Sequence, residues 1–354
     1  MHPKINLTHD QIEIFVFSWF FCDLITAIII KISHKIGALD KPHDYKAHAA
    51  PTPFFGGVAV YLGFMLALFT LLRVFDFQHL EKAYIMASGG FIVLLIGCFD
   101  DFISINAVLK LIFLFVVVFM LSKFNIEISL TNWDFINILL TLFWIVGVIS
   151  AFNSLDNTDG VAAGVGAIAA FWTYLIAWYS PKFGQPAVTY LSAAILGSLL
   201  GFLRYNFMPA KIFLGNNGAF VVGFILATLM VLTGWSQKDP IKSIVVPCAI
   251  LAVPLYDITL STILRIRRKV VKSVVEAIVY CGKDHITHRL IALGFSKFQT
   301  VIAIYLCSGL CGAIGAFIQL EDITKEIYLP IVFVSFILMV VVGRILDKAD
   351  VYKN

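Results

Sequence analysis

The chain has 354 residues, of which 60% are hydrophobic and only 14% charged, with a formal net charge of +4. Ordinary soluble domains carry roughly 25% charged residues, so a water-soluble protein is excluded. The small net charge gives no support for nucleic-acid binding, and the six cysteines show no CxxC spacing, so no disulfide or zinc framework is expected. The composition predicts a single polytopic membrane domain over residues 1–354.

Apolar runs of about 17 to 25 residues, long enough to cross a bilayer, recur eleven times. Their centres lie near Phe21, Phe64, Val93, Val116, Leu142, Ala170, Ala194, Ala227, Leu251, Tyr305 and Phe336. We therefore predict an all-α integral membrane protein with about eleven transmembrane helices. The first run follows a polar start and lacks a small-residue cleavage site, which is typical of a retained span.

The distribution of Lys and Arg predicts the orientation, because short cytoplasmic loops carry an excess of these residues. With the N-terminus outside and the C-terminus cytoplasmic, inward segments hold 18 and outward segments hold 8. Eight aspartates that were not used in this count also fall at inward positions: Asp40, Asp44, Asp100, Asp101, Asp156, Asp159, Asp257 and Asp284. A transporter would be expected to hold such groups near the midplane, so the pattern favours chemistry on a lipid head group at the cytoplasmic face.

The first two inward loops contain candidate phosphate and metal ligands. Residues 40–57 form a Pro-rich loop in which Lys41, Lys46 and His48 are placed to reach a phosphate, the alternative being a simple positive-inside anchor. The second loop begins with Asp100 and Asp101. Two adjacent carboxylates repel each other, so the pair indicates a bound cation such as Mg²⁺ or a shared proton, with one acid serving as a base, whereas the alternative is a solvated helix cap.

The third and fourth inward loops are rich in side-chain oxygens and glycine. If the third loop starts as a helix, Asn153, Asp156, Asn157 and Gly160 share one face and form an oxygen-rich pocket for a cation or a donor-rich ligand. An Asx-rich turn without function is the alternative. The fourth loop ends in a Gly-Asn-Asn-Gly turn at 215–218, which suits backbone N–H groups that point at an anion.

The long inward loop, residues 265–300, carries a His/Arg motif near its end. On a helix, His285 would lie beside His288 and Arg289, and Asp284 beside His288. The two histidines are candidate metal ligands, or they and the arginine neutralise a pyrophosphate. Zinc usually needs a third protein ligand, and Cys281 is poorly spaced for that role, so phosphate binding is favoured.

Together these loops resemble the polyprenyl-phosphate N-acetylhexosamine-1-phosphate transferase family, specifically its WecA and TagO type branch, related to MraY. Five patterns occur in family order: D-K-P with K-x-H and P-x-x-G-G in the first loop, the Asp pair, F-N-x-x-D-x-x-D-G-x-A-x-G at 152–164, F-L-x-x-N-x-x-P-A-x-x-F-x-G at 202–215, and H-x-x-H-R-L-x-x-L-G at 285–294. The resemblance covers most of the chain.

The resemblance implies a multi-pass enzyme of the bacterial cytoplasmic membrane that transfers N-acetylhexosamine 1-phosphate, GlcNAc-1-phosphate above all, from a UDP-sugar to undecaprenyl or another polyprenyl phosphate. It implies release of UMP, a need for Mg²⁺ or Mn²⁺, and a place at the first membrane step of a cell-envelope polysaccharide such as O-antigen, lipopolysaccharide or teichoic acid. The oligomeric state stays open, with a homodimer among the alternatives.

The site roles that the resemblance implies fall into three groups. Asp100 and Asp101 lie at the lipid-phosphate end, one of them as a base or orienting group. Asp156, Asn153 and Asn216 are the expected metal ligands. Substrate contacts are expected from Lys41, Lys46, His48, Asn153, Asp159, Asn206, His288 and Arg289, with catalytic parts for Asp156 and His285.

The chain also departs from the family pattern at several positions. Asn216 stands where the family usually has an Asp that resembles a metal ligand, Thr287 replaces the middle His of H-x-H-H, Asn157 replaces a Gly, and Ser150 an Asn. These departures bear on metal affinity and sugar identity, and they motivate an alternative function: a weak or inactive relative that binds lipid phosphate or nucleotide sugar without turnover.

Overall fold

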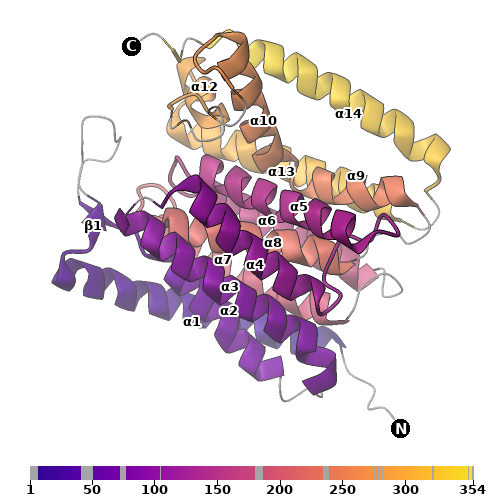
Figure 1. Ribbon diagram of the computed structural model, residues 1–354. Helices are drawn as coiled ribbons and strands as arrows, with labels where there is room; N and C mark the ends of the chain where they lie inside the picture. Colours follow the sequence, from indigo (N-terminus) through magenta and orange to yellow (C-terminus); the bar gives the residue numbers. More distant parts are fainter. Residues whose placement is uncertain are drawn as a thin grey trace.

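The computed structural model describes residues 7–40, 51–71, 77–103, 105–179, 186–233, 239–273, 276, 280, 282–320, 323–349 and 351–352. Within these residues the regular secondary structure is helical apart from one short antiparallel pair of strands (Figure 1). The elements are α1 (Leu7–Ile36), β1 (Leu39–Asp40), β2 (Thr52–Pro53), α2 (Gly56–Leu71), α3 (Phe77–Ile103), α4 (Ala107–Ser122), α5 (Asp134–Leu155), α6 (Val161–Tyr179), α7 (Pro186–Asn206), α8 (Gly215–Thr233), α9 (Pro240–Ile250), α10 (Ala252–Arg267), α12 (Ile286–Ala292), α13 (Lys297–Gln319) and α14 (Lys325–Leu346).

Every apolar run predicted to cross the membrane coincides with a helix or a helix pair. In the described part of the chain, eight helices are long and apolar enough to span a bilayer: α1, α3, α5, α6, α7, α8, α13 and α14. Helices α9 and α10 form a ninth candidate that is bent by 84°, and α2 and α4 are shorter apolar helices. The all-α membrane architecture is confirmed, while the count of eleven crossings and their orientation stay predictions.

Helix α8 lies at the centre of the bundle. It is the most buried of the candidate spans and packs against α3, α5 and α2, whereas α14 is the least buried and lies at the edge of the molecule (Figure 1). A helix buried on all sides must be apolar on all sides, which fits the sequence of α8 after its first turn. Its first turn therefore has to find polar partners inside the protein.

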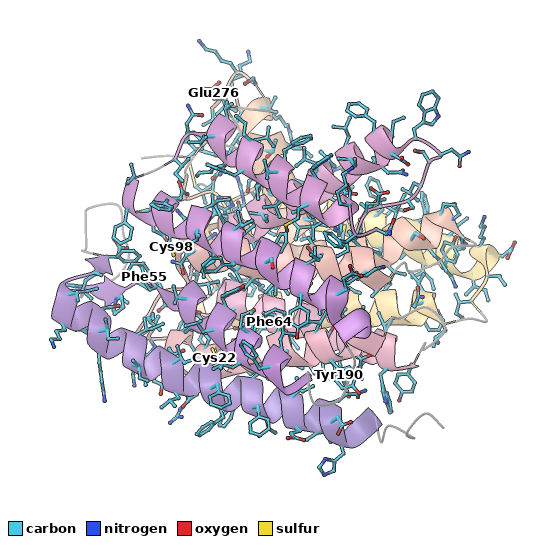
Figure 2. All side chains as sticks on the ribbon, turned by 60° about the horizontal axis from the view of Figure 1, so that its bottom comes forward. Cys22, Phe55, Phe64, Cys98, Tyr190 and Glu276 are labelled. Carbon is cyan, nitrogen blue, oxygen red and sulfur yellow. The ribbon has the colours of Figure 1, made fainter. Side chains whose placement is uncertain are left out.

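Helix α1 packs along α7 in a parallel direction. Gly197 lies against Phe15, Gly201 lies against Trp19, and Arg204 pairs with Asp23 at 2.9 Å, so the residue numbers of both helices rise together. Small residues allow such close helix contacts in membranes. The direction is the one expected for the first and seventh of successive crossings. Cys22 of α1 and Phe64 of α2 are both fully buried (Figure 2), and Gly63 of α2 lies against Cys22 and against Ser198 of α7.

Two apolar clusters position the polar loops. The larger one fills the centre of the bundle, and a smaller one lies among the ends of α5, α6, α10, α12, α13 and α14. Leu155, Leu264, Ile286 and Leu346 belong to the smaller cluster. Because burial of apolar side chains seats α12 on these helix ends, the His/Arg motif is held beside the loop that follows α5.

The strand pair fixes the beginning of α2 against the beginning of α8. Leu39 pairs with Pro53 and Asp40 with Thr52. The Pro53 carbonyl accepts a hydrogen bond from the Phe213 N–H at 2.8 Å, and the Gly57 N–H donates to the Leu214 carbonyl at 3.1 Å. These backbone bonds place the chain before α8 next to the chain before α2, at the end of the bundle where the predicted motifs lie.

Candidate active site

Asp101 caps the N-terminus of α8. Its carboxylate accepts hydrogen bonds from the backbone N–H groups of Asn216 and Asn217 at 3.0 and 3.1 Å, and from the Asn217 side-chain amide at 2.6 Å. The first N–H groups of a helix have no partner within the helix and carry a partial positive charge. The Gly-Asn-Asn-Gly turn was predicted to point its N–H groups at an anion, and in the protein that anion is Asp101.

Two glycines permit this contact between helices. A Cβ atom on Gly57 would lie 2.2 Å from the Gly218 nitrogen, and one on Gly97 would lie 2.4 Å from the Asn217 Cα. Because both obstacles are backbone atoms that cannot move aside, any larger residue would push α2 or α3 away from α8. The glycines therefore bring the end of α3, and Asp101 with it, onto the α8 N-terminus.

The neighbouring acid, Asp100, has a different partner. It is 6% exposed, its carboxylate lies 2.7 Å from the Lys110 ammonium group, and it also accepts from the Ile105 N–H at 2.8 Å and the Asn216 side-chain amide at 3.0 Å. The two charges are thus compensated separately, one by helix N–H groups and one by a lysine. We had assigned no role to Lys110, although a single basic residue in an apolar helix is itself a functional signal.

The loop after α5 does not form the polar helical face that we predicted. Helix α5 ends at Leu155, Asp156 is its C-cap residue, and Gly160 has a φ of +76°, so residues 156–160 form a turn. The expected i, i+3, i+4 and i+7 alignment is therefore wrong. Asparagine and aspartate favour turns because their side chains bond to nearby backbone, and here Asn157 donates to the Ser154 carbonyl at 2.8 Å.

The turn places Asp156 close to Asp101. Burial raises the pKa of the Asp156 carboxyl to about 7, the negative charge of Asp101 adds to that shift, and a hydrogen bond from the Gly215 N–H opposes it. Within the described residues no basic side chain pairs with Asp156. Two carboxylates that share one helix N-terminus, with one of them unpaired, create a local demand for positive charge.

Two long-range hydrogen bonds hold the turn through Gly160. The Asn206 side-chain oxygen accepts from the Gly160 N–H at 3.1 Å, and the Tyr305 hydroxyl donates to the Gly160 carbonyl at 2.6 Å. Asn206 is only 3% exposed, and its amide also donates to the Ile212 carbonyl at 2.9 Å. This geometry does not support the predicted substrate contact for Asn206, because both ends of its side chain are used to join two loops.

The remaining predicted residues on this side lie in different settings. Asp159 is partly buried and accepts from the Ala210 N–H at 3.0 Å, while Asn153 is exposed on the last turn of α5. Asn216 donates its side-chain amide to Asp100, which leaves its carbonyl oxygen as the atom that can bind a ligand. Lys41, Lys46 and His48 lie outside the described residues.

The His/Arg motif begins before α12 and not on it. His285 is the N-cap residue, so Asp284 and His285 precede the helix, and the expected helical pairing of Asp284 with His288 is wrong. The Asp284 carboxylate instead pairs with Arg265 at 2.6 and 2.8 Å. Burial alone would raise the pKa of Asp284, but the Arg265 guanidinium and the Tyr352 hydroxyl lower it below the ordinary value.

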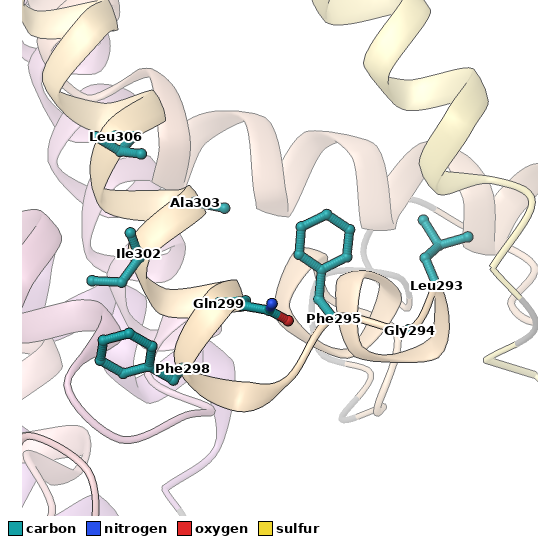
Figure 3. Close-up of a pocket in the computed structure, with 8 residues that line it drawn as sticks. All are labelled: Leu293, Gly294, Phe295, Phe298, Gln299, Ile302, Ala303 and Leu306. Atoms are coloured by element: carbon teal, nitrogen blue, oxygen red, sulfur yellow. The ribbon is translucent and has the colours of Figure 1, made fainter.

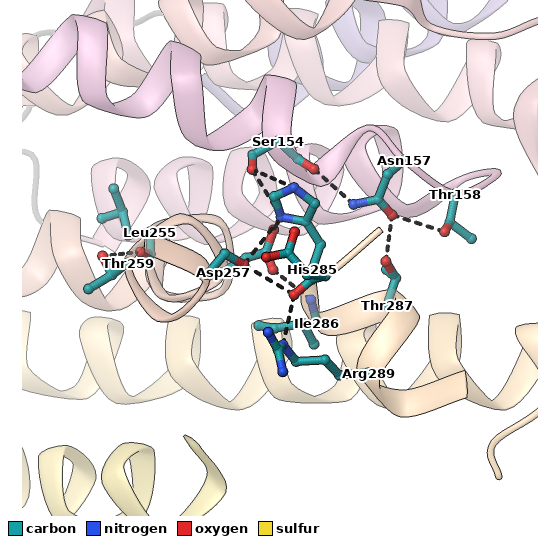
Figure 4. Close-up of polar contacts among 12 residues, drawn as sticks. Ser154, Asn157, Thr158, Leu255, Asp257, Thr259, His285, Ile286, Thr287 and Arg289 are labelled. Atoms are coloured by element: carbon teal, nitrogen blue, oxygen red, sulfur yellow. Dashed lines mark hydrogen bonds and ion pairs between the residues drawn. The ribbon is translucent and has the colours of Figure 1, made fainter. Parts of the chain in front are cut away.

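His285 is 7% exposed and bonded at both ring nitrogens (Figure 4). Its Nδ1 lies 2.9 Å from the fully buried Asp257 carboxylate, and its Nε2 lies 3.2 Å from the Arg265 Nη2. A guanidinium N–H can only donate, so we assign Nε2 as the acceptor and place the proton on Nδ1, where it is donated to Asp257. A buried ring with both nitrogens bonded inside the protein does not support the prediction that His285 neutralises a phosphate.

Arg289 is completely buried and bonded to groups inside the protein. Its guanidinium donates to the Asp284 carbonyl at 2.7 Å, the Tyr352 hydroxyl at 2.8 Å and the Leu346 carbonyl at 3.4 Å. The predicted direct contact of Arg289 with a diphosphate is not supported by this arrangement, because the charged fork already has partners in three directions. Sequence reasoning could not find these partners, two of which lie about sixty residues away.

The motif and the turn after α5 are joined by hydrogen bonds (Figure 4). The Ser154 hydroxyl lies 3.1 Å from the His285 Nδ1, and the Thr287 hydroxyl donates to the Asn157 side-chain oxygen at 2.5 Å. Asn157 and Thr287, two positions where the chain departs from the family pattern, thus contact each other. The contacts place the His/Arg motif beside the turn that carries Asp156.

His288 is the motif side chain left available. It is partly exposed, and no hydrogen bond to its ring occurs among the described residues. Burial lowers the pKa of His288, and the positive charge of Lys283 lowers it further, while Asp257 and Asp284 oppose the shift. His288 is therefore a neutral, partly exposed hydrogen-bonding group on α12 at pH 7.

The oxygen donors at the α8 N-terminus fit Mg²⁺ or Mn²⁺. Asp156 lacks a basic partner among the described residues, it lies close enough to Asp101 for their charges to repel, and the Asn216 carbonyl oxygen is not needed for the bond to Asp100. Hard divalent cations prefer such carboxylate and carbonyl oxygens. A divalent cation held by these oxygens would supply the positive charge that this region lacks.

A shallow apolar groove of about 480 Å³ follows the motif on α12 and α13 (Figure 3). Its lining residues are Leu293, Gly294, Phe295, Phe298, Gln299, Ile302, Ala303 and Leu306. None of the predicted site residues lines it, so the groove and the polar site are separate features at this end of the molecule.

Comparison with known proteins identifies one matching family and three similar proteins. Residues 83–234 match the model of glycosyl transferase family 4. The chain is 32% identical to a probable undecaprenyl-phosphate N-acetylglucosaminyl 1-phosphate transferase of Bacillus subtilis, over 91% of this chain and 88% of the relative. It is 28% identical to the decaprenyl-phosphate N-acetylglucosaminephosphotransferase of Mycobacterium leprae, over 82% and 79%.

The third relative is the undecaprenyl-phosphate alpha-N-acetylglucosaminyl 1-phosphate transferase of Escherichia coli K12. It is 24% identical to this chain, over 93% of this chain and 88% of the relative. The alignments with the Bacillus and Escherichia proteins thus extend over nearly the whole of both chains and are not confined to the acid motifs.

Proposed function

Because the chain belongs to glycosyl transferase family 4, we propose that it transfers N-acetylglucosamine 1-phosphate from UDP-GlcNAc to a polyprenyl phosphate and releases UMP. The apolar helices and the bacterial relatives make it a multi-pass protein of the bacterial inner membrane. The observation that carries the proposal is the meeting of Asp100, Asp101 and Asp156 at the N-terminus of α8, beside the His/Arg motif.

The reaction joins two anions. An oxygen of the lipid phosphate attacks the phosphorus that bears the sugar, and the bond from that phosphorus to the oxygen of UMP breaks. Such transfers depend on positioning and on compensation of charge more than on covalent help from the protein. A divalent cation, when bound, supplies charge neutralisation for the diphosphate. Asp156, with Asn216 and Asn153, would hold it.

The remaining roles in the reaction are assigned to side chains of the protein. Asp100, oriented by Lys110, and Asp101, held by the α8 N–H groups, lie at the lipid-phosphate end, where one accepts a proton or orients the attacking oxygen. His288 donates to the diphosphate of the UDP-sugar. His285 and Arg289 act as positioning residues, since both are buried and bonded internally. Asp159 supports the turn through Ala210, and Lys41, Lys46 and His48 remain proposed phosphate contacts.

Incubation of the purified protein with UDP-GlcNAc, undecaprenyl phosphate and Mg²⁺ tests the proposal by release of UMP. Omission of the lipid is the matched control, because release that does not require the lipid would be hydrolysis and not transfer. UDP-GalNAc in place of UDP-GlcNAc tests the sugar. Absence of lipid-dependent UMP at saturating Mg²⁺ would contradict the transferase.

Asn216 supports a second candidate function, a relative that binds without turnover. An Asn at this position gives the site one carboxylate fewer, and its amide is committed to Asp100. Binding of UDP-GlcNAc or polyprenyl phosphate, measured by calorimetry, together with no release of UMP would favour this candidate.

A further inference from the structure

The segment that follows α14 closes over the His/Arg motif. Asp347 pairs with Arg268 at 2.7 Å and with Arg267 at 3.1 Å, and Ala349 is buried. These contacts bring Tyr352 over the motif, 63 residues along the chain from Arg289. No sequence pattern singles out this segment, and no role has been assigned to it above.

Tyr352 is fixed by two hydrogen bonds and two charged neighbours. Its hydroxyl donates to the Asp284 carboxylate at 2.8 Å and accepts from the Arg289 Nη2 at 2.8 Å. The guanidinium carbon atoms of Arg268 and Arg289 lie 5.1 and 5.3 Å from the centre of its ring. Burial raises the pKa of Tyr352 to about 12, so the hydroxyl keeps its proton at neutral pH and can serve as a donor. One neutral hydroxyl thus bridges a buried acid and a buried base.

Three separate groups hold the start of α12. Asp257 accepts from the Ile286 N–H at 2.7 Å and binds His285. Ser154 at the end of α5 contacts His285, and Asn157 in the following turn contacts Thr287. Tyr352 binds Asp284 and Arg289. Ser154 and Asn157 belong to the end of α5 and to the turn that carries Asp156, whereas the Tyr352 hydroxyl bonds to Asp284 and Arg289. A change at the Tyr352 hydroxyl therefore acts on the motif without touching Asp100, Asp101 or Asp156.

The position of α14 makes the effect local. This helix is the least buried of the candidate spans. Its polar ties to the bundle include the bond from the Tyr256 hydroxyl to the Met339 carbonyl and the bond from the Tyr328 hydroxyl to the Asp239 carboxylate, both at 2.7 Å. Loss of one hydroxyl at Tyr352 leaves these bonds, the Asp347 pairs and the apolar cluster intact. The core of the bundle does not depend on it.

We propose that Tyr352 is a positioning residue for the nucleotide-sugar end of the site: it holds Asp284 and Arg289 so that α12 presents His288 to the donor. The inference rests on the proposed function for its kinetic consequence. Because the lipid phosphate is assigned to the acid pair, Tyr352 should control the affinity for the nucleotide sugar and leave the affinity for the lipid unchanged.

Kinetics of Tyr352→Phe test this selectivity, because the variant keeps the ring and removes only the hydroxyl. We expect the KM for UDP-GlcNAc to rise about tenfold, as loss of hydrogen bonds to charged groups requires, while kcat and the KM for undecaprenyl phosphate stay within about twofold. Tyr179→Phe, the same change at an exposed tyrosine at the end of α6, should match the wild type. An unchanged KM for UDP-GlcNAc, or a loss confined to kcat, would overturn the proposal.

Hydrogen exchange tests the attachment without relying on turnover. In Tyr352→Phe the backbone amides of 286–293 should exchange about tenfold faster than in the wild type, because the start of α12 opens more readily. Amides of α8 and those of the Tyr179→Phe control should not change. If the wild type shows no transfer, the proposed function fails by itself, whereas unchanged exchange over 286–293 would overturn the role of Tyr352.

Discussion

The acid site at the start of α8 and the His/Arg motif at α12 use charge in opposite ways. At the acid site, Asp101 is met by helix N–H groups and Asp156 has no basic partner in the described chain, so the region still attracts a cation. At the motif, Asp257, Asp284, Arg265 and Arg289 are buried and bonded to one another or to neighbouring groups. Similar residue types thus form an open site in one place and a closed support in the other.

This contrast teaches which changes should affect activity and which should affect folding. Removing a charge from an open site removes a ligand, and the rest of the protein loses little. Removing a charge from a closed network leaves its partner buried without compensation, which is costly. Substitutions in the two regions test this division.

Substitution of the acid pair should have the largest effect on activity. Asp100→Asn or Asp101→Asn removes a carboxylate that serves as base or orienting group, and we expect kcat to fall by at least about 100-fold. Asp100→Asn should also lose some stability, because Lys110 loses its charged partner. Both variants keep a side-chain oxygen that accepts hydrogen bonds, so both should still insert and purify as folded protein. UMP release is the measurement, and Asp134→Asn, an exposed acid at the start of α5, is the control. Retention of most activity by both variants would remove the pair from the mechanism.

Arg265→Ala should mainly reduce stability. It leaves the buried Asp284 carboxylate unpaired, and breaking a buried ion pair from one side costs about 3–5 kcal/mol. Thermal unfolding in detergent measures the loss. Arg204→Ala is the matched control, because it breaks an Arg–Asp pair whose arginine is 62% exposed, and such pairs contribute about 0–1 kcal/mol. Equal changes in the two variants would show that the Arg265 network is not a closed support.

Asn216→Asp should change the metal requirement by several-fold. A carboxylate binds Mg²⁺ more strongly than a neutral carbonyl oxygen, so the Mg²⁺ concentration for half-maximal activity should fall. Asn106→Asp adds the same charge at the exposed N-cap of α4, where Asp is also a good cap, and should leave the requirement unchanged. An unaltered requirement in Asn216→Asp would mean that residue 216 is no ligand, and absence of turnover in both forms would favour the non-catalytic relative.

His288 should give the smallest effect, a pH dependence of donor binding. Its lowered pKa keeps the ring neutral at pH 7. A bound diphosphate favours the protonated ring, so binding takes up a proton and the affinity for UDP should rise a few-fold between about pH 7.5 and 5.5. Calorimetry in buffers of different ionisation enthalpy measures the proton uptake. His288→Gln should abolish it and the exposed His34→Gln should not, while equal uptake in all three proteins would place His288 outside the donor site.

The sequence alone determined the elements and the chemical type of the site. Each apolar run became a helix because the bilayer requires continuous apolar segments with internally paired backbone, a rule that acts within a single segment. The Asp100 and Asp101 pair is recognisable from the sequence for the same reason. The cost of two adjacent carboxylates depends on their being neighbours in the chain and not on the rest of the fold. The motif order identified the family through these local patterns, and the comparisons confirmed that identification.

Which polar residues stay available to a ligand and which are bonded internally depends on how the helices pack. Asp101 meets Asn216 and Asn217 from 115 or 116 residues away, and Arg289 meets Tyr352 across 63 residues. The local sequence around Asn206 and around Arg289 does not reveal that both side chains are hydrogen-bonded to groups inside the protein. Hydrogen-bond partners are set by how helices pack, and packing is a property of the whole bundle, so the sequence predicted the groups that the site contains and the fold determined which of them remain available to a ligand.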